Sequence, residues 1–349
     1  MIRSTLLILF FSAVISTTDC RAQQVAAARP DSGSAEVVKH FNYTKAIALK
    51  RGAARALLCP EAGGRVLDFS VDGKGAMYLE EQEQQWQPGK AGAISAGRFD
   101  YGPELVTTPH PKLWSGEWTG EIIGSCAAKL TSPRDEVAGI QLVREFSLSP
   151  EAIVDGKPVA PSLLCKQTII NISNKTQEVC HWGRSFSPGG GICLIPLGDR
   201  PSRFPSKYVM YEEGATINVR NKDDLIRERD GFLEILAPPR KPKLGFDSYA
   251  GWLGYLLPND TLFVKRFATH PDRVYNEAAA ITLSVWYPTG PRIELEPIGP
   301  RERLKSGESA SFTEEWFLTT HPFPKAGQQV DLKQFHAHVT GVLTAPRTP

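Results

Sequence analysis

Two short segments of the sequence carry side chains suited to acid–base chemistry. Residues 166–196 predict a strand, a polar turn and a second strand that carries His181. Residues 292–300 (RIELEPIGP) alternate charged with apolar side chains, so Arg292, Glu294 and Glu296 share one face of a strand. A histidine and a carboxylate on separate strands can act as general acid and general base on a neutral polar substrate.

Residues 97–120 hold the densest group of side chains that could bind a sugar. If residues 114–118 are extended, Trp114 and Trp118 share one face, and an aromatic surface beside polar groups is what a pyranose needs. The polar candidates are Arg98, Asp100, Glu104 and His110, with Arg65 and Glu294 from elsewhere in the chain. The structural alternatives are that the tryptophans and His181 lie in the core, that Arg65 supports its turn, and that the charged face of residues 292–296 is solvated.

The bulk composition narrows the classes of function. The chain has 349 residues, of which 41% are hydrophobic and 22% charged, and its formal net charge of +2 does not favour nucleic acid as a partner. The sequence contains no P-loop, no GxSxG and no complete dinucleotide-binding glycine motif, and no Cys/His spacing fits zinc. We therefore expect neither a cofactor nor a metal.

The elements that must position these residues are strands. Glycines (30) and prolines (27) are spread along the chain, and β-branched or aromatic runs recur between turns, as at residues 163–172 and 252–256. Strands without intervening helices predict an all-β fold, a large antiparallel sandwich with few helices. The best helix candidate is 331–342, with Asp331 as its cap. Residues 36–349 are expected to form a single β domain.

The N-terminus predicts export. Residues 1–22 resemble a signal peptide, in which Arg3 supplies the positive start and the following apolar run is too short to span a bilayer. Residues 23–35 are rich in Ala, Pro and Ser and predict a disordered lead-in. The mature protein is therefore expected to be secreted or periplasmic, with no membrane segment after cleavage.

Three segments together resemble the galactose mutarotase-like proteins, the aldose 1-epimerase superfamily, and within it an exported branch. Residues 60–71 (PEAGGRVLDFSV) match the strand–turn–strand near the start of its members, and residues 169–186 match the middle segment that carries the acid histidine. Residues 295–297 fall on the strand that carries the base. The match departs from the family pattern at residues 180 and 182–184, and the family's second histidine has no counterpart.

The resemblance implies a β-supersandwich with a groove across one sheet that holds a carbohydrate, either a mono- or an oligosaccharide. It implies that Glu296 takes the proton of the anomeric hydroxyl while His181 protonates the ring oxygen, so that the ring opens and the anomers interconvert. Two alternatives stay open: a non-catalytic carbohydrate-binding protein, and a structural or interaction module with a vestigial groove. If His181 and Glu296 lie on opposite faces of the sandwich, the acid–base pair is excluded.

Overall fold

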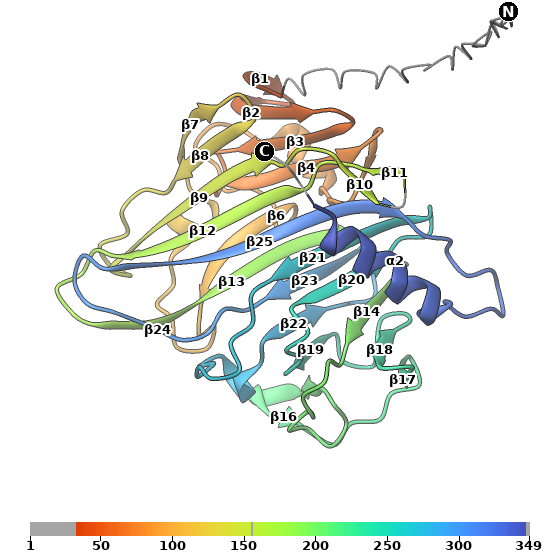
Figure 1. Cartoon of the computed structure of the whole chain (residues 1–349). Helices are drawn as coiled ribbons and strands as arrows, with labels where there is room; N and C mark the ends of the chain where they lie inside the picture. The colour runs from red at the N-terminus through yellow and green to blue at the C-terminus, as the bar shows by residue number, and fades with distance from the viewer. Residues whose placement is uncertain (1–32, 155, 347–349) are drawn as a thin grey trace, which may run out of the picture. The chain divides into compact units, whose positions relative to one another are not determined.

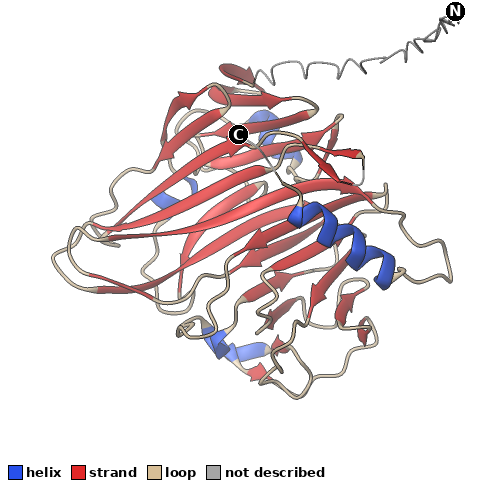
Figure 2. Ribbon diagram, viewed as in Figure 1, coloured by secondary structure: helices blue, strands red, loops and turns tan. Residues whose placement is uncertain are grey.

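The computed structural model describes residues 33–154 and 156–346, and most of its regular elements are strands (Figure 1). Figure 2 shows the strands in red with few helical segments between them. Residues 1–32, which include the expected signal peptide and most of the expected lead-in, lie outside the described residues. Strand β1 begins at Ser34, so Ser34 and Ala35 belong to the sheet and not to a lead-in that extends to residue 35.

Within the described residues the first sheet has 13 strands. They are β1 (Ser34–His40), β2 (Tyr43–Arg51), β3 (Ala54–Cys59), β4 (Arg65–Val71), β5 (Lys74–Gly75), β6 (Gly97–Gly102), β13 (Gln177–Pro188), β15 (Val209–Tyr211), β16 (Ile217–Asn218), β19 (Lys243–Phe246), β22 (Leu283–Trp286), β23 (Arg292–Pro297) and β24 (Glu302–Leu304). Their order is β1-β2-β3-β4-β6-β13-β23-β22-β19-β15-β16, with β5 beside β4 and β24 beside β13.

The second sheet has ten strands among the described residues. They are β7 (Thr119–Gly124), β8 (Ala127–Thr131), β9 (Ile140–Leu148), β12 (Leu163–Asn171), β14 (Ile192–Pro196), β17 (Ile226–Arg229), β18 (Phe232–Ile235), β20 (Trp252–Leu256), β21 (Thr261–Phe267) and β25 (Ser309–Thr320). Their order is β17-β18-β14-β20-β21-β25-β12-β9-β8-β7, and a separate hairpin pairs β10 (Ala152–Val154) with β11 (Lys157–Val159). Neighbouring strands in both large sheets are antiparallel, as in β12 with β25 and β13 with β23.

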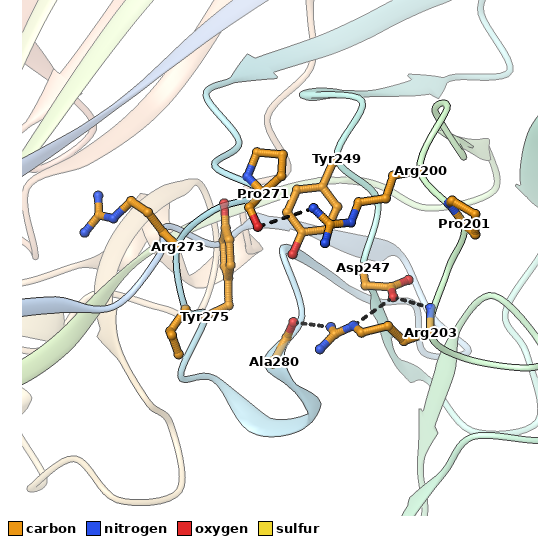
Figure 3. Close-up of a pocket in the computed structure, with 10 residues that line it drawn as sticks. Arg200, Pro201, Arg203, Asp247, Tyr249, Pro271, Arg273, Tyr275 and Ala280 are labelled. Atoms are coloured by element: carbon orange, nitrogen blue, oxygen red, sulfur yellow. Dashed lines mark hydrogen bonds and ion pairs between the residues drawn. The ribbon is translucent and has the colours of Figure 1, made fainter.

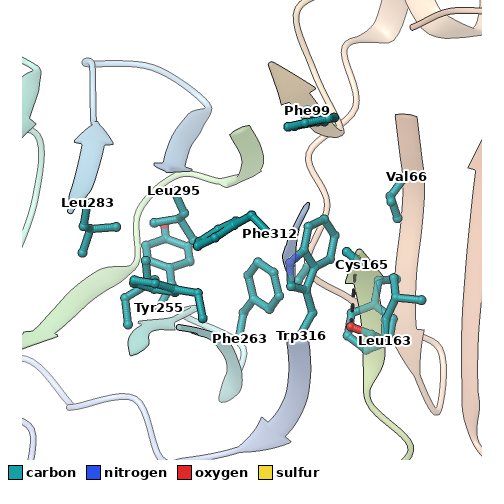
Figure 4. Packing of buried hydrophobic residues seen from close by; sticks show 14 of the residues in the cluster. Val66, Phe99, Leu163, Cys165, Tyr255, Phe263, Leu283, Leu295, Phe312 and Trp316 are labelled. Carbon is teal, nitrogen blue, oxygen red and sulfur yellow. Dashed lines mark hydrogen bonds between the residues drawn. The ribbon is translucent and has the colours of Figure 1, made fainter. Parts of the chain in front are cut away.

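The core lies between the two large sheets. Figure 4 shows Phe312 and Trp316 of β25 beside Phe263 of β21, with Leu295 of β23 and Phe99 of β6 approaching from the other sheet. The alternation of side chains along each strand gives every sheet an inner face. Along β9, for example, the side chains alternate between buried and half-buried. This packing fixes which face of β13 and of β23 turns inward and which turns outward.

The core between the sheets also contains a buried ion pair. Lys265 of β21 lies with its Nζ 2.9 Å from Glu314 Oε2, and both side chains are fully buried. Lys265 also donates to Ser185 Oγ at 3.1 Å, while Glu314 accepts from Gln167 and Trp316. Burial lowers the pKa of Lys265, although the neighbouring Glu314 opposes this shift.

The helices are few and short in the described chain. They are α1 (Pro111–Ser115) and α2 (Leu332–Thr344), with the 3₁₀ turns η1 (Glu81–Gln85), η2 (Glu213–Ala215) and η3 (Ala278–Ala280). Helix α2 confirms the prediction for residues 331–342, since Asp331 caps it by accepting from Gln334 N at 3.0 Å. Its apolar side packs on the outer face of the ten-stranded sheet. No described helix has the length and apolar composition needed to cross a membrane.

Candidate functional site

Side-chain alternation places the candidate residues of β13 and β23 on two different faces of the 13-stranded sheet. His181 points between the sheets, whereas its neighbour Trp182 belongs to a cluster on the opposite, outer face. Arg184 lies two residues further along β13 and also faces outward. On β23 the apolar residues belong to the core, so Glu294 and Glu296 face outward as well. Glu294 and Glu296 thus share one face of β23, as their alternation predicts, but both are buried there, so the alternative of a solvated face is wrong.

His181 is a core residue. Its ring is fully buried between Phe99 and Phe312, with ring centres 6.0 and 5.8 Å away. Its Nε2 lies 3.0 Å from the carbonyl oxygen of Ala310, so Nε2 carries the proton and donates, while Nδ1 has no partner in the described chain. Burial lowers the pKa of His181 to about 4, so it is neutral at neutral pH. This corrects the expectation that His181 faces the same cleft as Glu296.

The lowered pKa of His181 predicts a specific acid sensitivity. The neutral form of His181 is the one that the fold accepts, and above pH 6.5, the pKa of an ordinary histidine, the side chain is neutral in both the folded and the unfolded protein. As the pH drops from 6.5 towards about 4, the unfolded protein gains a proton that the folded protein does not, so the free energy of unfolding decreases. The loss should be about 3 kcal/mol across that window. Urea unfolding of wild type and His181→Leu between pH 7 and 4 measures it. The variant should lose less stability over this range, and equal pH dependence would contradict the assignment.

Arg184 organises the outer face. Its Nε lies 2.7 Å from Glu294 Oε1 and a second guanidinium nitrogen lies 3.3 Å from Oε2, which makes a bidentate pair. Asp100 and Glu104 lie 3.6 and 3.7 Å from its Nη1. Burial opposes its charge, but Glu294, Glu296 and Asp100 outweigh burial and hold the pKa of Arg184 well above its usual value. Burial raises the pKa of Glu294, which Arg184 only partly offsets.

Glu296 is fixed beneath Lys243. Its Oε2 accepts from Trp182 Nε1 at 2.7 Å and from Lys243 Nζ at 2.9 Å, and its side chain is fully buried. Lys243 Nζ also lies 4.8 Å from the centre of the Trp182 ring and 3.8 Å from Glu104. Burial works against the charge of Lys243, yet Glu296 and Glu104 outweigh it and raise its pKa. Glu296 is thus held as an acceptor for two fixed donors.

An open cavity of about 340 Å³ lies above these ion pairs, and we call it the Arg184 cavity. It is lined by Ile94, Glu104, Arg184, Phe186, Lys243, Trp286 and Glu294. Its volume falls within the range of small-molecule sites. The half-buried ring of Trp286 and several hydrogen-bonding groups therefore face one space, and the fully buried Phe186 forms part of its wall.

Asp100 and His110 form a supporting pair beside Arg184. His110 Nε2 lies 2.7 Å from Asp100 Oδ1, and its Nδ1 lies 2.6 Å from the carbonyl oxygen of Thr108. Although burial opposes both charges, their hydrogen bond raises the pKa of His110 and lowers that of Asp100. Both ring nitrogens of His110 thus point at acceptors, and the imidazole is engaged in holding Asp100.

The two tryptophans of residues 97–120 have different roles. Residues 111–115 form helix α1, so the expected extended face shared by Trp114 and Trp118 is wrong. Trp118 is buried in the core and its Nε1 donates to Leu113 O at 3.1 Å. The guanidinium groups of Arg98 and Arg184 both lie over the ring of Trp114, 4.2 and 4.8 Å from its centre. Trp114 thus helps to hold Arg184 in place.

Arg65 and Arg98 are too deeply buried to contact a ligand. Arg65 is fully buried, forms an ion pair with Glu83 and donates to Tyr43 Oη at 2.8 Å. Arg98 is also buried and donates to the carbonyl oxygens of Ala93 and Trp114. Burial, reinforced by the nearby Arg65, holds the pKa of Arg98 well below its usual value. Both arginines support the loops beside the cavity.

Sequence reasoning missed five residues of the Arg184 cavity, which are Ile94, Arg184, Phe186, Lys243 and Trp286. Arg184 and Phe186 follow Trp182 at every second position of β13, but alternation alone does not show that this set of positions faces outward. Lys243 and Trp286 carry no local sequence signal. They line the cavity only because β19 pairs with β22 and β22 pairs with β23.

Another cavity, of about 280 Å³, lies apart from the predicted site residues, and we call it the Arg200 cavity (Figure 3). Figure 3 shows Arg203 bonded to Asp247 and Arg200 beside Tyr249. Arg273 is paired with Glu302 at 2.8 Å.

In the described part of the chain, no group of three or more His, Cys, Asp or Glu side chains is placed to hold a metal ion.

Comparisons with known proteins address the fold. No family model and no curated protein matches the sequence. Solved structures match: a galactose mutarotase-like protein from Lactobacillus casei ATCC 334 is 11% identical, with a TM-score of 0.54 over 78% of this chain and 100% of its own. A galactose mutarotase-like protein from Clostridium acetobutylicum is 10% identical, with a TM-score of 0.52 over 84% of this chain and 100% of its own. The fold is galactose mutarotase-like.

A third structure supports the same fold. A galactose mutarotase related enzyme from Lactobacillus acidophilus is 9% identical, with a TM-score of 0.52 over 79% of this chain and 97% of its own. The β-supersandwich expected from the sequence is thereby confirmed. At these identities the likeness establishes the galactose mutarotase-like fold, while function has to be argued from the site.

Proposed function

We propose that this protein binds a carbohydrate in the Arg184 cavity. The observation that carries the proposal is the lining of that cavity, where the half-buried ring of Trp286 lies beside the polar groups of Arg184, Lys243 and Glu294. A sugar ring has an apolar C–H face that packs on aromatic rings, and hydroxyl groups that exchange hydrogen bonds with charged side chains. The galactose mutarotase-like fold supports a sugar as the ligand class.

The charge balance of the cavity favours a neutral sugar. Arg184 already pairs with Glu294, and Lys243 already pairs with Glu296. A neutral ligand leaves both pairs intact, whereas a charged ligand would have to compete with a partner that is buried and hydrogen-bonded. Hydroxyl groups can add to such pairs, since each carboxylate and each cation has further hydrogen-bonding capacity.

The same geometry favours binding over 1-epimerase catalysis. His181 lies on the other face of the sheet, and Glu296 is engaged by Trp182 and Lys243. A general acid and a general base must both reach the substrate within hydrogen-bond distance. We therefore expect the protein to bind a sugar without accelerating mutarotation through His181 and Glu296. The open cavity also favours a binding protein over a module with a vestigial groove.

Trp286→Ala tests the proposed site. Loss of the aromatic surface should weaken sugar binding by about 5- to 150-fold, or about 1–3 kcal/mol, by analogy with stacking of other rings on aromatic side chains. Isothermal titration calorimetry measures the affinity. Tyr249→Ala in the Arg200 cavity is the matched control, and it should bind like wild type. Equal affinity of Trp286→Ala and wild type would reject this cavity as the binding site.

We also propose that the protein is exported, on the basis of the signal-like residues 1–22. Mass spectrometry of the protein from its native host should find a mature N-terminus near Gln23. An intact N-terminus at Met1 would refute export by this route.

A further inference from the structure

A second cavity adjoins the Arg184 cavity. Its volume is about 510 Å³, and we call it the Gln85 cavity. It is lined by Glu80, Gln82, Glu83, Gln85, Trp86, Gln87, Lys90, Ala91, Ala93, Ile94 and Arg292. Most of these residues belong to η1 and to the chain that follows it towards β6. The Gln85 cavity is thus built by one continuous segment of chain, with Arg292 added from β23.

Two residues join the cavities. Ile94 lines both of them, and it is 53% exposed. Arg292 lines the Gln85 cavity, and its guanidinium carbon lies 5.5 and 5.7 Å from the ring centres of Trp286 and Phe186, which line the Arg184 cavity. Arg292 is held there by an ion pair with Glu80 and by a hydrogen bond of 3.1 Å to the carbonyl oxygen of Ile94. The two cavities therefore meet at a fixed, partly exposed boundary.

The chemistry of the Gln85 cavity suits a polyhydroxylated ligand. Gln82, Gln85 and Gln87 are exposed, and each amide can both donate to and accept from a hydroxyl group. The buried acid of the cavity, Glu83, is already paired with Arg65. The exposed polar groups of the cavity are therefore these three amides and the charged Lys90, and the amides match the neutral ligand inferred for the Arg184 cavity.

We propose that the ligand is an oligosaccharide of at least two sugar units, with one unit in the Arg184 cavity and the next in the Gln85 cavity. The chain of sugars passes over Ile94 and Arg292, and Arg292 donates to it at the junction. This proposal rests on the proposed function, because it assigns the length of the carbohydrate that the same site takes.

Calorimetry with graded sugars tests the proposal. The probes are malto-, cello-, xylo-, manno- and galacto-oligosaccharides of one to four units. In any series that binds, the di- or trisaccharide should bind at least about 10-fold more tightly than its monosaccharide, because it adds the contacts of the second cavity. Equal affinity of monosaccharide and trisaccharide would overturn the oligosaccharide proposal and leave the proposed function standing. No binding in any series would overturn both.

A double variant separates the second cavity from the first. Gln82→Ala/Gln85→Ala removes two exposed amides and should weaken trisaccharide binding by at least about 5-fold while monosaccharide affinity stays unchanged. Gln328→Ala/Gln329→Ala removes two exposed amides ahead of α2 and should bind both sugars like wild type. A Gln82→Ala/Gln85→Ala protein with wild-type trisaccharide affinity would place the additional sugar units elsewhere.

Discussion

Lys265→Met is expected to lower the free energy of unfolding by about 3–5 kcal/mol, because it leaves Glu314 buried without its cation. Glu314 is fully buried between the sheets, where water cannot replace the lost partner. Its remaining donors, Gln167 and Trp316, are neutral and compensate only in part. Urea unfolding monitored by tryptophan fluorescence measures the change.

Two further variants show whether the uncompensated charge is the cause. Lys265→Met/Glu314→Gln removes both charges and keeps an acceptor for the neighbouring donors, so it should recover part of the lost stability. Lys129→Met breaks an exposed pair with Glu121 and should cost less than about 1 kcal/mol. If Lys265→Met and Lys129→Met cost the same, the ion pair is not a significant part of the core.

Arg184→Met is expected to cost about 3–5 kcal/mol of stability at pH 8 and to abolish measurable sugar binding. The variant leaves Glu294, which is 2% exposed, without its bidentate partner. It also removes a hydrogen-bonding group from the cavity wall. Unfolding experiments at pH 5 and pH 8, together with calorimetry, measure both effects.

The stability cost of Arg184→Met should be smaller at pH 5 than at pH 8. Burial already raises the pKa of Glu294, and removal of the guanidinium raises it further. A carboxyl group whose pKa is raised in the folded protein contributes most to the free energy of unfolding at low pH. This contribution is lost as the pH rises through the raised pKa. Arg184→Met/Glu294→Gln should remove this pH dependence. Arg134→Met, which breaks an exposed pair with Glu136, should cost less than about 1 kcal/mol at either pH.

The strand pattern of the fold could be predicted where polar and apolar side chains alternate. Residues 292–296 alternate charged and apolar side chains, and the structure places the two kinds on opposite faces of β23, although Glu294 and Glu296 are buried on the outer face. The helix near residue 331 could be predicted because its cap and its apolar spacing are both local signals.

The position of His181 could not be predicted from alternation. Residues 179–183 of β13 are all buried, because the outer face of the strand is covered as well as the inner one. Without a polar face the sequence does not show which side chains turn inward. The resemblance placed His181 at the acid position, but the register of β13 turns Trp182 towards the outer face instead.

The prediction that residues 114–118 are extended was wrong, and a local sequence signal points to the helix instead. Pro111 stands at the first position of helix α1, where proline is favoured as a helix start. That signal predicts a turn of helix and not an extended segment. Lys243 and Trp286 had no comparable signal. Lys243 is 53 residues from Glu296 in the sequence, and only the sheet order brings the two together.

A crystal structure with a bound sugar tests the central claim most directly. Crystals soaked with the sugar that binds best in calorimetry should show a sugar ring against Trp286, with its hydroxyl groups within hydrogen-bond distance of Arg184 and Glu294. A sugar bound in the Arg200 cavity, or an empty Arg184 cavity at a saturating sugar concentration, would contradict the claim.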